Sequence, residues 1–286
     1  MIQGSQCIVV SRDKAPRYLK KDYVLGSYLV GGTRSEAAKR TLFSCTNETL
    51  NAWTTIISLV LVNVQYLRSR CGVTIRWDTL RWDAPASNGF VVFDLFYLSG
   101  TLHAPFSLCC SLWVGISLKE RDFWRQLDVF FIFTASVFRG AAIGWPVLST
   151  ATYKLYIVAL LADYAFCITS TMILRQIKDI PRRQIVFGVG GMCAGHALPM
   201  LVACVAELQR GTVGRSIALS FGVVLCLGLS ALICTKNVPE KWKPGSAFDI
   251  LHSHALMHVL VYLEYYFEWL FICHHMYSTT AADGDQ

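Results

Sequence analysis

Charged side chains are scarce in this chain. Among its 286 residues, Asp, Glu, Lys and Arg make up 16% and hydrophobic residues 54%, and the mean hydropathy is +0.43. That balance is too apolar for a water-soluble globule of this length. Basic residues exceed acidic ones, giving a net charge of +7, but they are spread over separate polar segments. This spread excludes nucleic acid as the expected partner.

Paired cysteine motifs are also missing. The eleven cysteines are scattered, mostly in apolar stretches, without a Cys-x-x-Cys pair, so we interpret most of them as small core residues rather than ligands of a thiolate cluster. No cleavable signal peptide is expected, because residues 1–40 are polar and basic and have no apolar core. The glycines between 188 and 195 follow no predicted strand. They therefore indicate close helix packing rather than phosphate binding.

Long apolar stretches, by contrast, are numerous. A helix needs roughly 20 apolar residues to cross the ~30 Å hydrocarbon layer, and seven stretches meet or approach that length. The predicted spans are 52–67, 90–113, 127–145, 153–173, 185–206, 214–234 and 250–273. The sequence therefore predicts an all-α integral membrane protein, a bundle of seven transmembrane helices within residues 46–273.

The distribution of Lys and Arg predicts the orientation of this bundle. With these spans, 18 of the 26 basic residues fall in the N-terminal segment and the loops of the same side, 7 fall on the other side, and Arg139 lies within the third span. Basic residues accumulate on the cytoplasmic side. We therefore expect a basic cytoplasmic tail and lead-in (1–45), flexible through residue 25, and a short external tail (274–286). The plasma membrane and the endomembranes (endoplasmic reticulum or Golgi) both remain open as the location.

The clearest chemical pattern opens the seventh span. His254 and His258 are four residues apart, so on a helix they share one face and can bind one ion. A zinc site takes three protein ligands plus water when catalytic, or four protein ligands when structural, and His103 in the second span is the best third candidate. Asp128 enters from the same side of the bilayer. His252 falls on the opposite side of the helix, and we interpret it as interfacial.

These residues and their neighbours resemble a known family. The motifs are Asn47-Glu-Thr-Leu-Asn-Ala-Trp-Thr54, Ser99 four residues before His103, Leu127-Asp128, Pro239-Glu240, Pro244-Gly245, Phe248-Asp249, and Ser253-His254 to His258. Together, from about Gly26 to about Val261, they resemble the progestin and adipoQ receptor (PAQR) family, which is related to hemolysin III. One position departs from the pattern, because Thr55 stands where many members carry a histidine.

The resemblance implies an intramembrane zinc centre. It implies Zn²⁺ bound by His103, His254 and His258 with water in the fourth position, Asp128 accepting a hydrogen bond from that water, and Ser99 lining the same pocket. Asp128 and Ser99 are thus the candidate catalytic residues. The adiponectin-receptor branch further implies hydrolysis of a lipid amide such as ceramide. The expected partners are then the bilayer, a ceramide-like substrate and an extracellular ligand.

Other functions remain open. A non-enzymatic receptor or membrane-organising protein would use the zinc structurally. An alkaline-ceramidase relative would share the Ser, Asp and three-His pattern, although the loop from Pro239 to Asp249 favours the PAQR family. A pore would need a continuous polar stripe, for which few residues are available. Asp163 and His196 are ionisable groups within the membrane, where they are costly, and each is either functional or paired with a neighbour.

Three further features have local structural interpretations. Glu48 and Asn51 are expected to make structural hydrogen bonds at the cytoplasmic mouth of the bundle. Pro105, two residues after His103, should kink the second helix. The loop 235–249, which contains two prolines and a glycine, should be a rigid turn that fixes the start of the seventh helix.

Overall fold

Helices dominate the computed structural model, which describes residues 6–71, 89–173, 182–211 and 213–283. Within these ranges, seven helical segments are long and apolar enough to cross a membrane. They are Thr49–Arg70, Val91–Trp113, Leu118–Gly144, Thr150–Thr171, Gly190–Gln209, Arg215–Lys236 and Ser253–Met276. The expected all-α, seven-helix membrane architecture is thereby confirmed.

The chain forms two compact units. Unit 1 comprises residues 1–60, 103–129 and 225–263, and unit 2 comprises residues 61–102, 130–224 and 264–286. Four helices contribute residues to both units, namely α2 (Thr49–Cys71), α5 (Leu118–Gly144), α9 (Arg215–Lys236) and α10 (Ser253–Asp283).

In unit 1, residues 6–25 are folded, whereas the sequence led us to expect a flexible tail through residue 25; residues 1–5 of that prediction lie outside the described residues. Strands β1 (Ile8–Val10) and β2 (Tyr28–Val30) pair antiparallel with Ile8 opposite Val30, and the short 3-10 helix η1 (Arg17–Leu19) lies between them in the sequence. The side chains of Ala15, Leu19, Val24 and Tyr28 form a buried hydrophobic cluster in this segment. These four residues are irregularly spaced in the sequence, so they show neither a helical nor a strand period, and they come into contact only when the strands pair.

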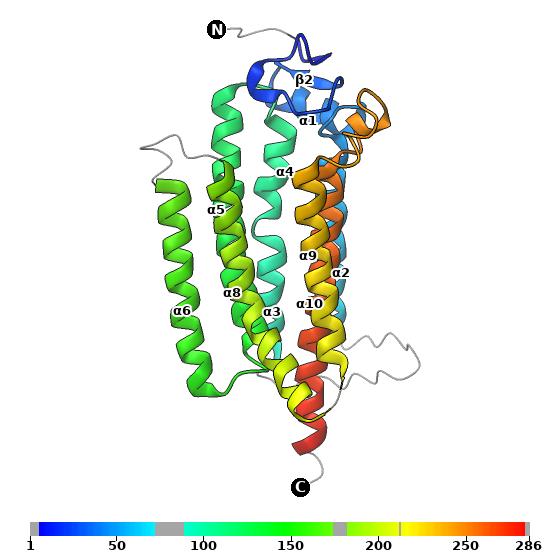
Figure 1. The fold of residues 1–286 in the computed structure, drawn as a ribbon. Helices are drawn as coiled ribbons and strands as arrows, with labels where there is room; N and C mark the ends of the chain where they lie inside the picture. Colours follow the sequence, from blue (N-terminus) through cyan, green and yellow to red (C-terminus); the bar gives the residue numbers. More distant parts are fainter. Residues whose placement is uncertain (1–5, 72–88, 174–181, 212, 284–286) are drawn as a thin grey trace. The chain divides into compact units, whose positions relative to one another are not determined.

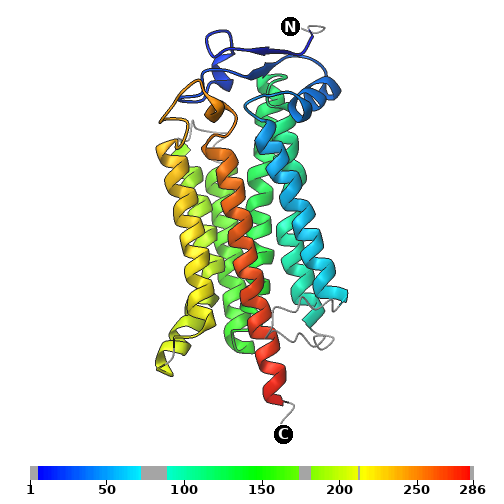
Figure 2. The same ribbon diagram turned by 90° about the vertical axis from the view of Figure 1, so that its right-hand side faces the viewer.

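Helix α1 (Arg34–Phe43) continues this N-terminal layer. It begins with a capping box, in which the Thr33 hydroxyl accepts from the Glu36 amide and the Glu36 carboxylate accepts from the Thr33 amide, so two exposed helix-end groups are satisfied. The helix packs against α4 (Ala104–Trp113), and the Trp113 indole donates to the Arg34 carbonyl oxygen at 3.1 Å. The strands, α1 and the loop after α9 lie at the same end of unit 1 (Figures 1 and 2).

The loop between α9 and α10 holds the start of α10. Both carboxylate oxygens of Glu240 accept from Ser253, one from its amide at 2.7 Å and one from its hydroxyl. Asp249, in the 3-10 turn η3 (Ala247–Asp249), accepts from the amides of Gly245 at 3.0 Å and Gly26 at 2.7 Å. The expectation that this loop fixes the seventh helix is confirmed, and the two acidic residues are its physical basis.

In unit 2, glycines allow three helices to approach closely. Helix α6 (Thr150–Ile168), which continues into the π-helical turn η2 (Thr169–Ile173), packs against α8 (Arg182–Gln209). The Tyr156 hydroxyl donates to the Gly195 carbonyl at 3.1 Å, and a Cβ at Gly140 on α5 would lie 2.5 Å from that same hydroxyl oxygen. At Gly195, where a Cβ would lie 3.3 Å from Leu160 on α6, the interpretation of a packing glycine is borne out, whereas at Gly190 nothing described lies within 4 Å of such a Cβ.

The helix that carries His103 is interrupted as expected. Helix α3 (Gly89–Thr101) ends before this residue and α4 begins after it, with Pro105 in the first turn of α4. The His103 carbonyl accepts from the amides of Phe106 and Ser107, each at 3.0 Å. The proline has no amide hydrogen to continue the preceding helix, so a new helix starts at this point.

Candidate metal centre

Two imidazoles meet on the first turns of α10. The ring centroids of His254 and His258 lie 4.8 Å apart, as the spacing of four residues predicts. The side chain of His254 is exposed in the protein alone and that of His258 is partly buried. The pair is therefore open on the His254 side to a ligand.

The orientation of His258 is fixed by two hydroxyls of α2. Its Nδ1 lies 3.1 Å from the Oγ1 atoms of both Thr54 and Thr55. Each of these hydroxyls also donates to a backbone carbonyl within α2, that of Leu50 or Asn51. Because the hydroxyl hydrogens are used there, Nδ1 of His258 is the donor and Nε2 keeps its lone pair. This tautomer is the one a histidine needs to bind a metal through Nε2.

Asp128 brings a carboxylate into the same unit. Ser107, one turn after His103 on α4, hydrogen-bonds to it, whereas its Oδ1 atom is buried and has no hydrogen-bond partner among the described residues. Arg125 lies within electrostatic range of both Asp128 and His254. A buried acceptor oxygen without a donor is costly, so Oδ1 marks a place where a donor belongs.

Four of the five residues predicted for the site belong to one unit, and the fifth belongs to the other. His103, Asp128, His254 and His258 belong to unit 1, and His103 stands at the N-cap of α4. Ser99 belongs to unit 2, where its fully buried hydroxyl donates to the Phe96 carbonyl at 2.6 Å. Its role in lining the pocket stays a prediction.

A buried polar network lies beside the histidine pair. Glu48 accepts from the Lys21 ammonium at 2.6 Å and from the Asn51 amide at 2.5 Å. His252 is buried within the protein, with Nε2 2.7 Å from the Asn47 carbonyl oxygen, and its interpretation as an interfacial residue stays a prediction. It precedes the first residue of α10, and its Nδ1 accepts from the His254 amide at 3.2 Å. This contact points the ring inward.

The ionisation of this network follows from burial and from Lys21. Burial, with the nearby Lys21 ammonium, lowers the pKa of His252 to about 3. Burial, the largest single effect, raises the pKa of Glu48, but nearby charges, Lys21 first, and the hydrogen bonds from Lys21 and Asn51 together hold that pKa below its usual range. At neutral pH the network is thus a neutral imidazole beside a carboxylate–ammonium pair. The structural role expected for Glu48 and Asn51 agrees with these contacts.

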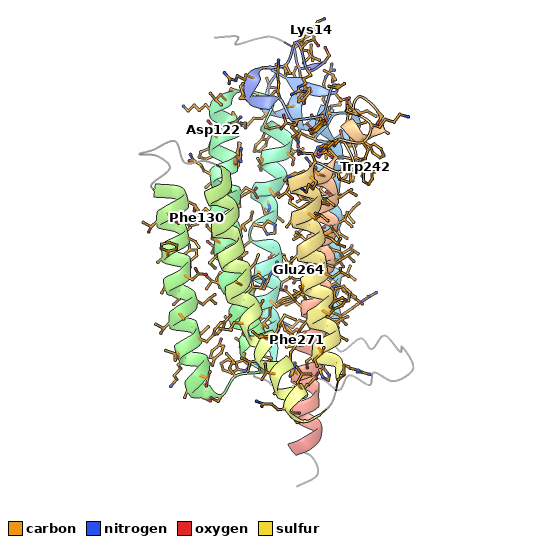
Figure 3. All side chains as sticks on the ribbon, viewed as in Figure 1. Lys14, Asp122, Phe130, Trp242, Glu264 and Phe271 are labelled. Carbon is orange, nitrogen blue, oxygen red and sulfur yellow. The ribbon has the colours of Figure 1, made fainter. Side chains whose placement is uncertain are left out.

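Replacing Lys21 with methionine should lower the free energy of unfolding by about 2 kcal/mol, because it leaves the Glu48 carboxylate buried without its charged donor. Denaturant unfolding in detergent measures this loss. Lys14, a lysine of the same N-terminal segment on the surface (Figure 3), is the matched control, and Lys14→Met should change stability by less than about 0.5 kcal/mol. Equal losses from the two changes would contradict a specific role for Lys21.

The three histidines and the aspartate fit a zinc ion chemically. Three imidazoles form a known ligand set for catalytic zinc, which leaves one position open. Both the acceptor Nε2 of His258 and the unpartnered Oδ1 of Asp128 suit an ion with a nearby water. The sequence pattern identified the histidines and included Thr54 and Thr55, but it did not predict that these two hydroxyls contact His258. Their signal is a pair of hydroxyls one turn into the first span.

From the sequence, we identified only one member of a second group of side chains that could bind a metal ion. In the described part of the chain, His196, Glu264 and Glu268 form the group in which one ligand atom from each residue lies within 4.8 Å of the others. His196 was singled out as an intramembrane ionisable residue, but the two glutamates were not. Their signal was present in the sequence, because Glu264 and Glu268 are four residues apart within an apolar span.

Comparison with known proteins agrees with this architecture. Residues 43–269 match the model of a family described as haemolysin-III related. The chain belongs to this family. A heptahelical transmembrane protein named ADIPOR3, from Oryza sativa subsp. japonica, is 36% identical over 72 residues, which cover 25% of this chain and 18% of the relative. The resemblance to the PAQR and hemolysin III group is therefore confirmed, and the chain is a multi-pass membrane protein of the haemolysin III-related family.

Proposed function

We propose that this haemolysin III-related protein is a zinc-dependent hydrolase of a lipid amide such as ceramide. The observation that carries the proposal is the His254–His258 pair on α10, with the Nδ1 of His258 committed to two threonine hydroxyls and its Nε2 left as an acceptor. His103, at the α3–α4 break, is the proposed third ligand, because both ring nitrogens of His252, the other histidine of unit 1, are engaged by the Asn47 carbonyl and the His254 amide.

The ion would supply a Lewis acid that polarises the amide carbonyl and acidifies a water molecule. Asp128 would accept the proton of the attacking water at Oδ1 and deliver it to the leaving amine. Ser107 supports this role because its hydrogen bond to the carboxylate restrains the side chain. Thr54 and Thr55 would hold His258 in the orientation that binds the ion. Ser99 remains the proposed lining residue.

A lipid substrate is supported by where these residues lie. His103, Asp128, His254 and His258 all belong to segments that are long and apolar enough to cross a membrane. A substrate that reaches such a site must partition into the bilayer, and a long-chain amide does so readily. We propose the orientation in which the N-terminus is cytoplasmic, on the basis of the Lys and Arg distribution; the site then lies toward the cytoplasmic face.

The proposal is tested by measuring zinc content and ceramide turnover on the same purified samples. The double change His254→Ala/His258→Ala should remove one zinc ion per chain relative to wild type and abolish turnover, because two of the three ligands are lost. A matched control replaces two other histidines of the same helix, His274 and His275, with alanine. This control should keep the wild-type zinc content and turnover.

Two results would contradict the hydrolase. If the double variant loses one zinc ion but the wild type turns over neither ceramides nor other lipid amides, the zinc is structural and a receptor or membrane-organising role is favoured. If the double variant keeps the wild-type zinc content, His254 and His258 are not ligands and the site assignment fails.

A further inference from the structure

A buried cluster of charged side chains lies in unit 2, on three membrane-spanning helices. His196 comes from α8, Glu264 and Glu268 from α10, and Arg139 from α5. The exposed fractions are 1% for His196, 2% for Glu264, 0% for Glu268 and 8% for Arg139, and Figure 3 shows Glu264 among the helices. Ionisable groups so deeply buried are expensive and are retained where they pair or bind something.

The distances from His196 to the two carboxylates are long for hydrogen bonds. Nε2 of His196 lies 3.3 Å from a Glu268 oxygen and 3.6 Å from a Glu264 oxygen, whereas good N–H···O bonds measure about 2.7–3.2 Å. Ligands at about 2.1 Å from a tetrahedral ion lie about 3.4 Å from one another. The observed separations therefore match the edges of a metal coordination shell better than they match direct hydrogen bonds.

Several atoms of the cluster have no hydrogen-bond partner in the described structure. They include both ring nitrogens of His196 and both carboxylate oxygens of Glu268. Arg139 does pair with the carboxylates, through Nη1 to Glu264 at 3.1 Å and Nε to Glu268 at 3.5 Å, but it does not satisfy His196. Buried polar groups almost always have a hydrogen-bond or ligand partner. These atoms therefore indicate that an ion or molecule binds between them.

The charges of the cluster leave room for a cation. With His196 neutral, the two carboxylates exceed the single guanidinium by one negative charge. A cation bound between them offsets this excess.

We infer that His196, Glu264 and Glu268 bind a second divalent transition-metal ion. An imidazole nitrogen together with two carboxylate oxygens suits zinc and its first-row neighbours rather than calcium or magnesium. Histidine and glutamate side chains from facing helices are a common way for helical bundles to bind metals. Arg139 is a positioning residue, which orients both carboxylates.

The experiment measures zinc bound per chain after equilibrium dialysis of the purified protein against zinc. The wild type should bind two ions, and the His254→Ala/His258→Ala variant should keep one. Adding His196→Asn and Glu268→Gln to that variant should reduce the content to zero. Glu207→Gln, which changes a carboxylate of the same unit that accepts from backbone amides near Ser216, is the matched control and should keep two ions.

The inference fails if the wild type binds at most one ion and His254→Ala/His258→Ala removes it. The cluster would then be an ion-pair network completed by a proton on His196. It also fails if His196→Asn/Glu268→Gln, folded as judged by monodisperse elution, still binds as many ions as its parent. One ion that persists in His254→Ala/His258→Ala but is lost in His196→Asn/Glu268→Gln would support this site and contradict the first.

Discussion

Replacing Asp128 with asparagine should lower lipid-amide turnover by about 10²- to 10⁴-fold, the usual contribution of a positioned general base. The amide side chain has nearly the same shape and can still contact Ser107, but it cannot accept a proton at Oδ1. Zinc content should stay at the wild-type value, because Asp128 is not a proposed ligand. Both quantities are measured on one preparation, with the substrate in mixed micelles.

Asp122→Asn is the matched control for this change. Asp122 lies on the same helix, α5, where it pairs with Arg121 at 2.8 Å and is partly exposed. We expect turnover within about two-fold of wild type for this variant, since surface changes away from the site have small effects. If the Asp128→Asn variant turns over substrate nearly as fast as the Asp122→Asn variant, Asp128 takes no part in proton transfer. That result is the one expected if the zinc ion is structural.

Replacing Arg139 with methionine should destabilise the protein by about 3–5 kcal/mol, the usual result of removing one partner from a buried ion pair. Both Glu264 and Glu268 would lose their guanidinium partner in the ion pairs while they remain 2% and 0% exposed. The methionine side chain fills similar space, so the loss reports charge rather than a cavity. Denaturant unfolding in detergent micelles, with metal removed by a chelator, measures the effect.

Removing the negative charges should reverse most of this loss. In the triple change Arg139→Met/Glu264→Gln/Glu268→Gln, no buried charge is left without a partner, so the free energy of unfolding should return to within about 1–2 kcal/mol of wild type. If Arg139→Met alone costs less than about 1 kcal/mol, the carboxylates are protonated or solvated, and the ion pairs do not stabilise unit 2.

Local sequence features predicted much of the fold. Seven apolar stretches predicted the seven helices. Each span must form its own backbone hydrogen bonds within the membrane, and this requirement does not depend on its neighbours. Pro105 predicted the break between α3 and α4. Its missing amide hydrogen is a property of this one residue, so the prediction needs no knowledge of distant contacts. His254 and His258 were found for the same reason, since the helical repeat alone places them on one face.

The remaining features depend on partners far away in the sequence. The N-terminal strands are held by contacts such as the hydrogen bond from the Gly31 amide to the Gly115 carbonyl. No local pattern in the sequence predicts such a contact. The threonines that orient His258 are about 200 residues before it. Glu264 gave a weak signal alone, and its importance appears only when α5 supplies Arg139 and α8 supplies His196.

The Glu240 contacts with Ser253 set the rotation of the helix that carries the histidine pair. Each residue turns an α-helix by about 100°, so moving the first turn by one residue relative to Glu240 would swing both imidazoles away from their present direction. Their separation along the helix would be unchanged. Two acidic side chains outside the site, Glu240 and Asp249, thus determine the direction in which His254 and His258 point. A loop with the same composition but a different length would keep both histidines and change the direction of their side chains.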